Sequence, residues 1–349
     1  MDPGRNCRII GKEQTLIKKI KPLIHRLIEK IDYLIFPIIH ERYHARILQM
    51  CKEIAYSGKG SDACLKEGFL PVPVHFYSPI PDIDDLKKRR VWDVRSSLAG
   101  IDFRPVAQLD LLQEFGSRYG GECRWPLLPT NDPFEFHVQN QSFSYGCAAS
   151  THCMIRQLRP GHVIEIGSGM SSRVIAGAIN KNLRQYGQAC EYTIVDPYPG
   201  EPIRNSARGN ITLIESRVEL LDPALFSRLG SNDILFIDSS HSVKIGGDVN
   251  YLFLEVLPRL APGVVIHIHD IALPFEYDKA YATNEAFRQF WTEQYLLQSF
   301  MSCNNEFIVL LALSYLMTDH MDAFKEAFKH YDPTIHLFNS GSFWIQRNP

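Results

Sequence analysis

Two glycines that could shape a ligand site follow a short apolar run, in the segment EIGSG at residues 165–169. Glycine permits the sharp turn that ends a buried strand, and it lets a ligand lie against the backbone. The next residues, Ser171–Tyr186, can form a helix whose first amide groups would donate hydrogen bonds to that ligand. A second apolar run ends at Asp196, where a carboxylate can accept hydrogen bonds from both hydroxyls of a ribose. The pattern predicts a site for an adenosine-bearing ligand.

Acids and histidines follow two further apolar runs. Asp238 and His241 come directly after one, and His269 and Asp270 end the other. Histidine suits a general base near neutral pH, because its unperturbed pKa is about 6.5. In an extended strand His269 would share a side with His267, and Asp270 would face the other side. We expect His267, which lies deeper in its run, to be a hydrogen-bonded core histidine.

Short apolar runs alternate with helical stretches after about residue 140. Runs that are apolar throughout are typical of strands buried on both faces, in a parallel sheet covered by helices. The pattern therefore predicts an α/β fold with a doubly wound sheet and a last strand that could be antiparallel. The predicted strands are Val163–Ile166, Tyr192–Val195, Ile211–Ile214, Ile234–Ile237, Val264–Ile268, Phe307–Leu311 and Ser342–Gln346, and the further helices are Ala224–Leu229, Val249–Leu260 and Asn284–Phe300.

The N-terminal part of the chain has a different character. Apolar residues recur at three- and four-residue steps over Gln14–Cys51, which predicts a helix divided by Pro22 and Pro37. Its polar face is basic. This face could be solvated while the helix packs on the body or on a second subunit, or it could rest on an anionic membrane surface. The proline-rich segment that follows, up to Pro133, excludes a regular array of helices. It could form a cap or collar over an active site, or a structural wrap around the main domain.

Composition limits the class of protein. The chain has 349 residues and a formal net charge of −2, which argues against nucleic acid as the main partner. Eight cysteines are present and none forms a C-x-x-C pair, so we expect reduced thiols of a cytoplasmic protein. We find no secretory signal and no apolar stretch of about 20 residues that could span a bilayer.

The spacing Glu165-x-Gly167-x-Gly169 resembles motif I of class I S-adenosylmethionine methyltransferases. The resemblance implies a Rossmann-like sheet, with Glu165, Gly167, Ser168 and Gly169 at the methionine end of the cofactor and Asp196 on its ribose. A nicotinamide or flavin site of the form G-x-G-x-x-G is the rival interpretation, although Ser172 stands at its third glycine.

The later motifs resemble those of the macrocin- and mycinamicin-type sugar O-methyltransferases and of uncharacterised bacterial relatives. They are D-x-x-H at residues 238–241 and a Pro-Gly turn, strand and His-Asp at residues 262–270. The resemblance implies O-methylation of a sugar or polyol, with His241 as general base and Asp238 as a metal ligand beside the cofactor. It also implies two adjacent acids after the last of these strands, where this chain has His269 and Asp270. An imidazole is a poor ligand for magnesium and a good one for manganese, iron or zinc, so the divalent metal could differ. The alternative is that no metal binds and that Asp238, His269 and Asp270 form a hydrogen-bonded collar at the strand ends.

These inferences predict three regions: a helical segment at 1–60, a proline-rich cap at 61–139 and a Rossmann-like catalytic domain at 140–349. The expected partners are S-adenosylmethionine and a small-molecule or glycan acceptor, with a homo-oligomer or peripheral membrane contact through residues 14–51. We also expect Asn140, Tyr145 and Glu293 near the pocket. Two other functions stay open, an NAD(P)-dependent oxidoreductase and a non-catalytic scaffold that binds a glycan or another partner.

Overall fold

The computed structural model describes residues 43–206, 211–335 and 340–349. The chain divides into two compact units between Leu86 and Lys87. In the first unit, residues 43–57 are helical and α2 follows at Ser61–Lys66. Most of the helix predicted over Gln14–Cys51 lies outside the described residues, so its proposed docking role remains a prediction. Within the described residues, no helix is both long enough and apolar enough to cross a membrane.

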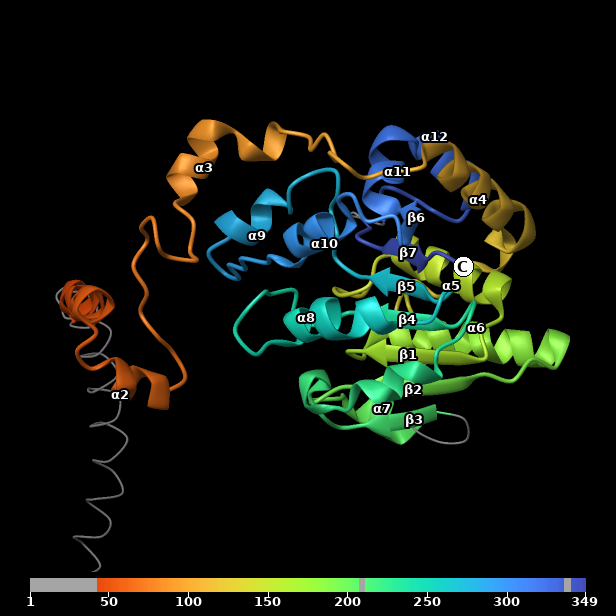
Figure 1. Cartoon of the computed structure of the whole chain (residues 1–349), viewed down its shortest axis with the longest axis horizontal. Helices are drawn as coiled ribbons and strands as arrows, with labels where there is room; N and C mark the ends of the chain where they lie inside the picture. Colours follow the sequence, from red (N-terminus) through yellow and green to blue (C-terminus); the bar gives the residue numbers. More distant parts are fainter. Residues whose placement is uncertain (1–42, 207–210, 336–339) are drawn as a thin grey trace, which may run out of the picture. The chain divides into compact units, whose positions relative to one another are not determined.

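The second unit contains a seven-stranded sheet in the order β3-β2-β1-β4-β5-β7-β6 (Figure 1). The first five strands pair in parallel, and β7 is antiparallel to both β5 and β6. This arrangement confirms the predicted Rossmann-like α/β fold, including its antiparallel last strand. The strands are β1 (His162–Ile166), β2 (Glu191–Val195), β3 (Ile211–Ile214), β4 (Ile234–Ile237), β5 (Val265–Ile268), β6 (Phe307–Ala312) and β7 (Phe343–Arg347).

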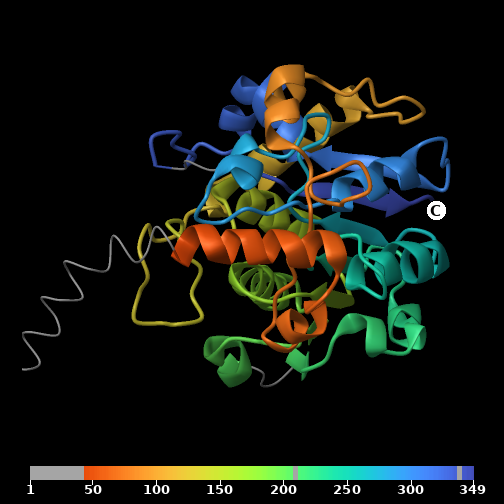
Figure 2. The ribbon, with the colours of Figure 1, turned by 90° about the vertical axis from the view of Figure 1, so that its left-hand side faces the viewer.

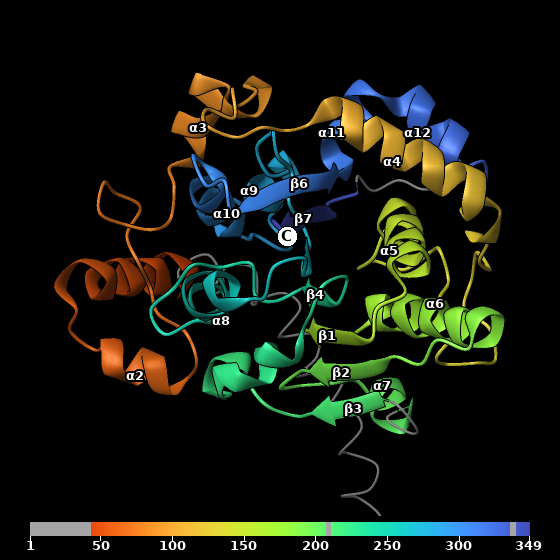
Figure 3. The same ribbon diagram turned by 45° about the vertical axis from the view of Figure 1, so that its right-hand side comes forward.

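Helices cover both faces of this sheet. Helix α6 (Met170–Tyr186) lies on one face, and α8 (Asp248–Tyr251) lies on the other (Figures 2 and 3). All four residues of β4 and of β5 are buried, as expected of strands that are apolar on both faces. Helix α3 (Ile83–Arg89) spans the boundary between the two units. The other helices of the second unit are α4 (Pro105–Arg118), α5 (Tyr145–Leu158), α7 (Glu201–Ser206), α9 (Lys279–Thr283), α10 (Glu293–Met301), α11 (Leu313–Asp319) and α12 (Met321–Ala327).

One helix was not predicted from the sequence, and another was predicted to begin too early. The proline-rich region contains the 14-residue helix α4, whose first residue is Pro105. Proline is tolerated there because the first helical N–H has no intrahelical partner. The helix predicted over Asn284–Phe300 begins only at Glu293, because the amides of Thr292 and Glu293 both donate to the carbonyl of His241. A distant loop therefore sets the start of α10.

Candidate functional site

The loop between β1 and α6 packs tightly against the end of β4. Gly167 adopts a left-handed backbone, with φ of 82°, and its N–H donates to the carbonyl of Val195. A Cβ added to Gly167 would lie 1.9 Å from the carbonyl oxygen of Asp238. Only glycine therefore allows this loop to approach the end of β4.

Glu165 lies behind this loop and is fully buried. Its two carboxylate oxygens accept hydrogen bonds from the hydroxyls of Ser171 at 2.6 Å and Ser172 at 2.7 Å, and Tyr192 donates a third. The carboxylate thus anchors the first turn of α6. Burial raises the pKa of Glu165 to about 7, although the three hydroxyl donors oppose the rise.

The buried Glu165 should make stability depend on pH. In the unfolded chain its carboxyl ionises near 4.5, whereas in the folded protein it ionises near 7. The free energy of unfolding should therefore fall by up to about 3 kcal/mol as the pH rises through this window. Urea unfolding of wild-type protein and of Glu165→Gln at several pH values measures the effect. In Glu165→Gln the free energy of unfolding should no longer fall with pH in this window, whereas the surface variant Glu201→Gln should behave like wild type. The same fall in wild type and in Glu165→Gln would contradict the raised pKa of Glu165.

Asp196 follows β2 and holds the glycine loop from the other side. One carboxylate oxygen accepts hydrogen bonds from the amide of Ser168 at 2.9 Å and from its hydroxyl at 2.5 Å. The other oxygen accepts the amide of Tyr198 at 2.7 Å. A carboxylate offers about four acceptor positions, so this second oxygen keeps room for a ligand hydroxyl.

A cavity of about 540 Å³ opens at the carboxyl ends of β1, β2 and β4. It brings together four of the predicted cofactor residues, Gly167, Ser168, Asp196 and Asp238. Glu165 and Gly169 do not line it, so Glu165 can act on a ligand here only by positioning the loop. Further lining residues follow β3 and β4 and were not predicted, although their position after strand ends could have indicated them: Arg217, Val218, Glu219, Ser239, Ser240, Lys244 and Asp248.

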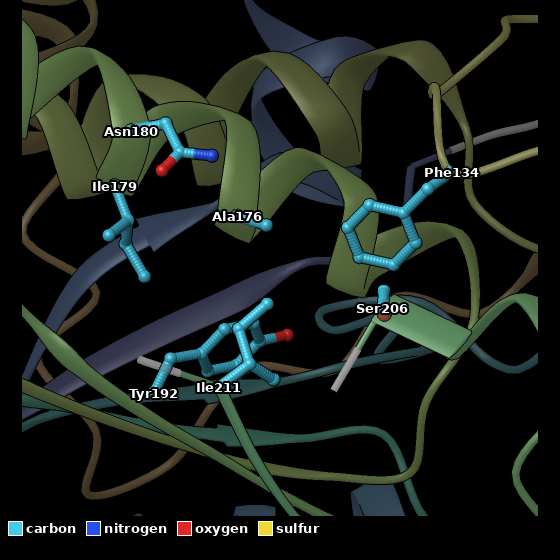
Figure 4. A pocket seen from close by; sticks show the side chains of 7 residues that line it. All are labelled: Phe134, Ala176, Ile179, Asn180, Tyr192, Ser206 and Ile211. Carbon is cyan, nitrogen blue, oxygen red and sulfur yellow. The ribbon is translucent and has the colours of Figure 1, made fainter. Parts of the chain in front are cut away.

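A second cavity, of about 290 Å³, lies elsewhere in the same unit, beside α6 (Figure 4). Its walls mix apolar and polar surface, and Tyr192 contributes from β2. It shares no residue with the larger cavity. The lining side chains are Phe134, Ala176, Ile179, Asn180, Tyr192, Ser206 and Ile211.

The predicted acids and histidines form one cluster at the ends of β4 and β5. Asp238 Oδ1 lies 3.4 Å from His241 Nε2 and 3.3 Å from His269 Nδ1. Asp270 lies 3.5 Å from His241 Nε2 and 3.6 Å from His269 Nδ1. The prediction that Asp270 faces away from His269 was wrong, because Asp270 has a left-handed φ of 56° that turns its side chain into the cluster. His241 has the same φ.

Glu293 joins this cluster from the first turn of α10. It is fully buried, and its Oε2 lies 2.8 Å from Nδ1 of His241. The other two residues expected near the pocket have structural contacts instead. Tyr145 donates its hydroxyl to the carbonyl of Cys123, and Asn140 bonds to the backbone of its own loop.

His267 is the core histidine that the pattern predicted. It is fully buried, its Nε2 lies 2.8 Å from the hydroxyl of Ser342, and its ring stacks on Phe236 with centroids 3.8 Å apart. Burial holds the pKa of His267 well below its usual range. His267 is therefore a neutral packing residue, apart from the charged cluster next to it.

Opposite charges dominate the cluster. Burial works to raise the pKa of Asp238, but His269 and His241 outweigh it and hold that pKa well below the usual range. Burial likewise works to lower the pKa of His241, but Asp238 and Glu293 raise it to about 10. Without a bound cation, His241 is thus an imidazolium at neutral pH.

The donor atoms suit a divalent cation. One ligand atom from each of Asp238, His241 and His269 lies within 4.8 Å of the others. Nδ1 of His269 is one of ten buried side-chain N or O atoms in the described residues without a hydrogen-bond partner, and it faces carboxylates of Asp238 and Asp270 at 3.3 and 3.6 Å. A buried polar nitrogen left unpaired is costly, and a cation among these donors would satisfy it. Imidazole and carboxylate together are a common donor set for divalent transition metals.

Parts of this chain are similar to known proteins. An uncharacterised protein of Archaeoglobus fulgidus is 29% identical over 199 residues, covering 55% of this chain and 87% of the relative. Among solved structures, the apo form of CmcI aligns at 15% identity and a TM-score of 0.34, over 65% of this chain and 85% of its own. A protein from Thermobifida fusca YX, proposed to be a methyltransferase, aligns at 15% identity and a TM-score of 0.34, over 70% of this chain and 94% of its own.

One family model covers the glycine loop, the cavity and the acid–histidine cluster together. Residues 164–271 match the family described as a methyltransferase domain. That segment runs from β1 to the residues just after β5, and it includes Asp196, Asp238 and His241. This part of the Rossmann-like unit is therefore similar to a methyltransferase domain.

Proposed function

We propose that the protein transfers a methyl group from S-adenosylmethionine to a hydroxyl of a sugar or polyol. The observation that carries the proposal is the position of Asp238, which lines the 540 Å³ cavity and also belongs to the acid–histidine cluster. A cofactor in the cavity would thus end beside the groups that can handle the acceptor's proton. Such proximity is what an in-line transfer between two bound molecules needs.

The cavity fits the cofactor in size and chemistry. Small-molecule sites usually enclose about 300–1,000 Å³. Gly167 and Ser168 bring backbone to the cavity wall, and Asp196 offers a carboxylate oxygen to the ribose. S-adenosylmethionine supplies an activated methyl group on a sulfonium. The contribution of the protein would be to hold this group near Asp238 and to exclude water from it.

We further propose His241 as the general base, assisted by a divalent cation at Asp238, His269 and Asp270. A bound cation would supply positive charge that polarises the acceptor hydroxyl. Positive charge next to Asp238 would also lower the pKa of His241, which Asp238 and Glu293 raise in the metal-free protein. Since Glu293 holds Nδ1 of His241, Nε2 is the nitrogen available to take the proton.

Asp196→Ala tests the cofactor site. Loss of this carboxylate should weaken S-adenosylmethionine binding by about 30-fold or more, because a charged hydrogen bond contributes about 1.5–3 kcal/mol. Calorimetry on the purified protein measures the affinity. Ser168→Ala is the matched control, because it removes only the hydroxyl bond to Asp196 and should have a smaller effect. Unchanged affinity in a folded Asp196→Ala protein would remove this site from the proposal.

The same calorimetry distinguishes a methyltransferase from the two alternatives, an NAD(P)-dependent oxidoreductase and a non-catalytic scaffold. A nicotinamide oxidoreductase would bind NAD(P) in preference to S-adenosylmethionine, and a scaffold would bind neither. Mass spectrometry of sugars and polyols incubated with isotope-labelled S-adenosylmethionine then identifies the acceptor. Labelled methyl on a sugar or polyol oxygen is the expected product, and label on nitrogen would contradict the proposed acceptor class.

A further inference from the structure

We infer that the side chains of Trp291 and Tyr281 form a platform on which the ring of a pyranose acceptor stacks beside His241. The inference rests on the proposed function and narrows its acceptor to a sugar in its ring form, with an acyclic polyol as a poor acceptor. It also assigns a role to the segment between β5 and α10, which contributes no residue to either cavity described above.

Aromatic rings gather next to His241. The ring of Trp291 lies against the imidazole of His241, with centroids 4.6 Å apart and 52° between the planes. The ring of Tyr281, from α9, lies 4.3 Å from that of Trp291 at 42°. Phe287 extends the group, because its ring is 6.3 Å from that of Tyr281 in an edge-on arrangement. Trp291 and Tyr281 are half-buried and Phe287 is 46% exposed, so the group keeps surface for a ligand.

Hydrogen bonds tie the backbone after Trp291 to the loop that carries His241. The amides of Thr292 and Glu293 both donate to the carbonyl of His241, at 2.9 and 3.2 Å. The hydroxyl of Thr292 also accepts the amide of Val243 at 2.7 Å. The position of Trp291 next to His241 is therefore set by backbone hydrogen bonds as well as by the contact between the two rings.

Other contacts fix Tyr281 and Trp291 relative to each other. Helices α9 and α10 lie side by side (Figures 1 and 3), and the amide of Gln289 donates to the carbonyl of Tyr281 at 2.8 Å. This bond closes the loop between the two rings. Tyr277 packs edge-on against Trp291 with centroids 5.8 Å apart, and its own hydroxyl accepts the amide of Gln294 at 3.0 Å. A platform held in this way loses little freedom when a ligand binds.

The platform also lies close to the methyl donor of the proposed function. Trp291 contacts His241, and Nε2 of His241 lies 3.4 Å from Asp238, which lines the 540 Å³ cavity. A ring stacked on Trp291 would thus have its edge hydroxyls within reach of His241 and of a cofactor that ends beside Asp238. Such placement is what transfer between two bound molecules needs.

The chemistry of a stacked aromatic surface favours a ring sugar. An aromatic face carries partial negative charge, and the C–H bonds on one face of a pyranose present partial positive charge over a similar area. An acyclic polyol must give up rotation about several C–C bonds to present such a face. Tyr281 can add a hydrogen bond, because burial and the nearby Asp270 raise the pKa of Tyr281 to about 12 and keep its hydroxyl a donor.

Intrinsic fluorescence of the full-length protein tests binding without turnover. The chain has four tryptophans, and a sugar stacked on Trp291 should change the emission. We expect a response to at least one of the methyl pyranosides of glucose, galactose, mannose and rhamnose, and none to sorbitol. Trp291→Phe should abolish the response, whereas Trp125→Phe, in a separate aromatic group, should keep it. No response to any pyranoside, an equal response to sorbitol, or a response that survives in Trp291→Phe would overturn the inference.

Turnover of the pyranoside that binds best distinguishes a platform from a packing residue. Trp291→Leu keeps an apolar side chain but loses the aromatic face, so KM should rise about 10-fold or more, and Trp291→Phe should raise it less. The kcat should change less than KM and should keep its pH dependence, because the lost contact is a binding contact. If Trp291 only packs on His241, kcat should fall and its pH dependence should shift while KM stays. That result, or an unchanged KM in folded Trp291→Leu, would overturn the inference.

Failure of the proposed function has a different outcome. In that case wild-type protein would transfer no labelled methyl to any sugar or polyol, even where a pyranoside changes the fluorescence. Transfer to sorbitol as efficient as transfer to the pyranosides would instead support the proposed function and contradict the platform. Circular dichroism of each variant verifies folding, and S-adenosylmethionine affinity on the same samples verifies that the cofactor site is intact.

Discussion

Gly167→Ala is expected to destabilise the protein by about 2–5 kcal/mol and to abolish cofactor binding in any fraction that folds. A left-handed backbone costs a residue with a Cβ about 1–2 kcal/mol, and overpacking adds about 1–3 kcal/mol. The new Cβ would meet the carbonyl oxygen of Asp238 at 1.9 Å, so the loop and the end of β4 would have to separate. Denaturant unfolding and calorimetry with S-adenosylmethionine measure the two effects.

Gly177→Ala is the matched control for this variant. Gly177 lies within α6, it has no left-handed backbone, and an added Cβ would find no atom within 4 Å. Alanine in a helix interior is favoured over glycine by about 0.5–1 kcal/mol, so this variant should be slightly more stable than wild type. If Gly167→Ala were as stable as Gly177→Ala and bound the cofactor normally, the close approach of the loop to Asp238 would be wrong.

Asp238→Asn is expected to lower methyl transfer by about 10²–10⁴-fold and to abolish any response to added metal. Asparagine keeps the size of the side chain but removes the charge that faces both His241 and His269. The change should therefore disable proton transfer and the cation site together. Transfer of labelled methyl to the sugars and polyols, with and without added manganese, measures the rate.

Asp248→Asn is the control for Asp238→Asn. Asp248 lines the same cavity but bonds to Ser240 and lies outside the acid–histidine cluster, so its variant should keep the metal response. Chelator treatment of the wild type divides the two parts of the mechanism. Activity lost in chelator and restored by manganese supports the cation, whereas full activity in chelator leaves His241 as a base without a metal. Near wild-type turnover in Asp238→Asn would contradict both parts.

The sequence by itself determined the sheet and the location of the cofactor loop. Strands buried on both faces are mostly apolar, with Glu165 in β1 and His267 in β5 as buried exceptions, so their apolar runs marked β1 to β7 to within a residue or two. Gly167 and Asp196 could be found because parallel strands place their carboxyl ends at one edge of the sheet. The same rule predicts that Asp238 and His269 lie close together, since each follows the end of a parallel strand.

Only the tertiary structure decided how these residues act. Glu165 is a buried support for α6, because Ser171, Ser172 and Tyr192 surround it in the folded chain. Glu293 contacts His241, which lies 52 residues earlier in the sequence, and no local sequence pattern predicts such a contact. The left-handed turn at Asp270 packs closely against the backbone of Gly341, where an added Cβ would lie 2.8 Å from the Cα of Asp270. Contacts between residues distant in sequence determine these features, whereas the periodicity of apolar residues along the sequence indicates only which residues are buried.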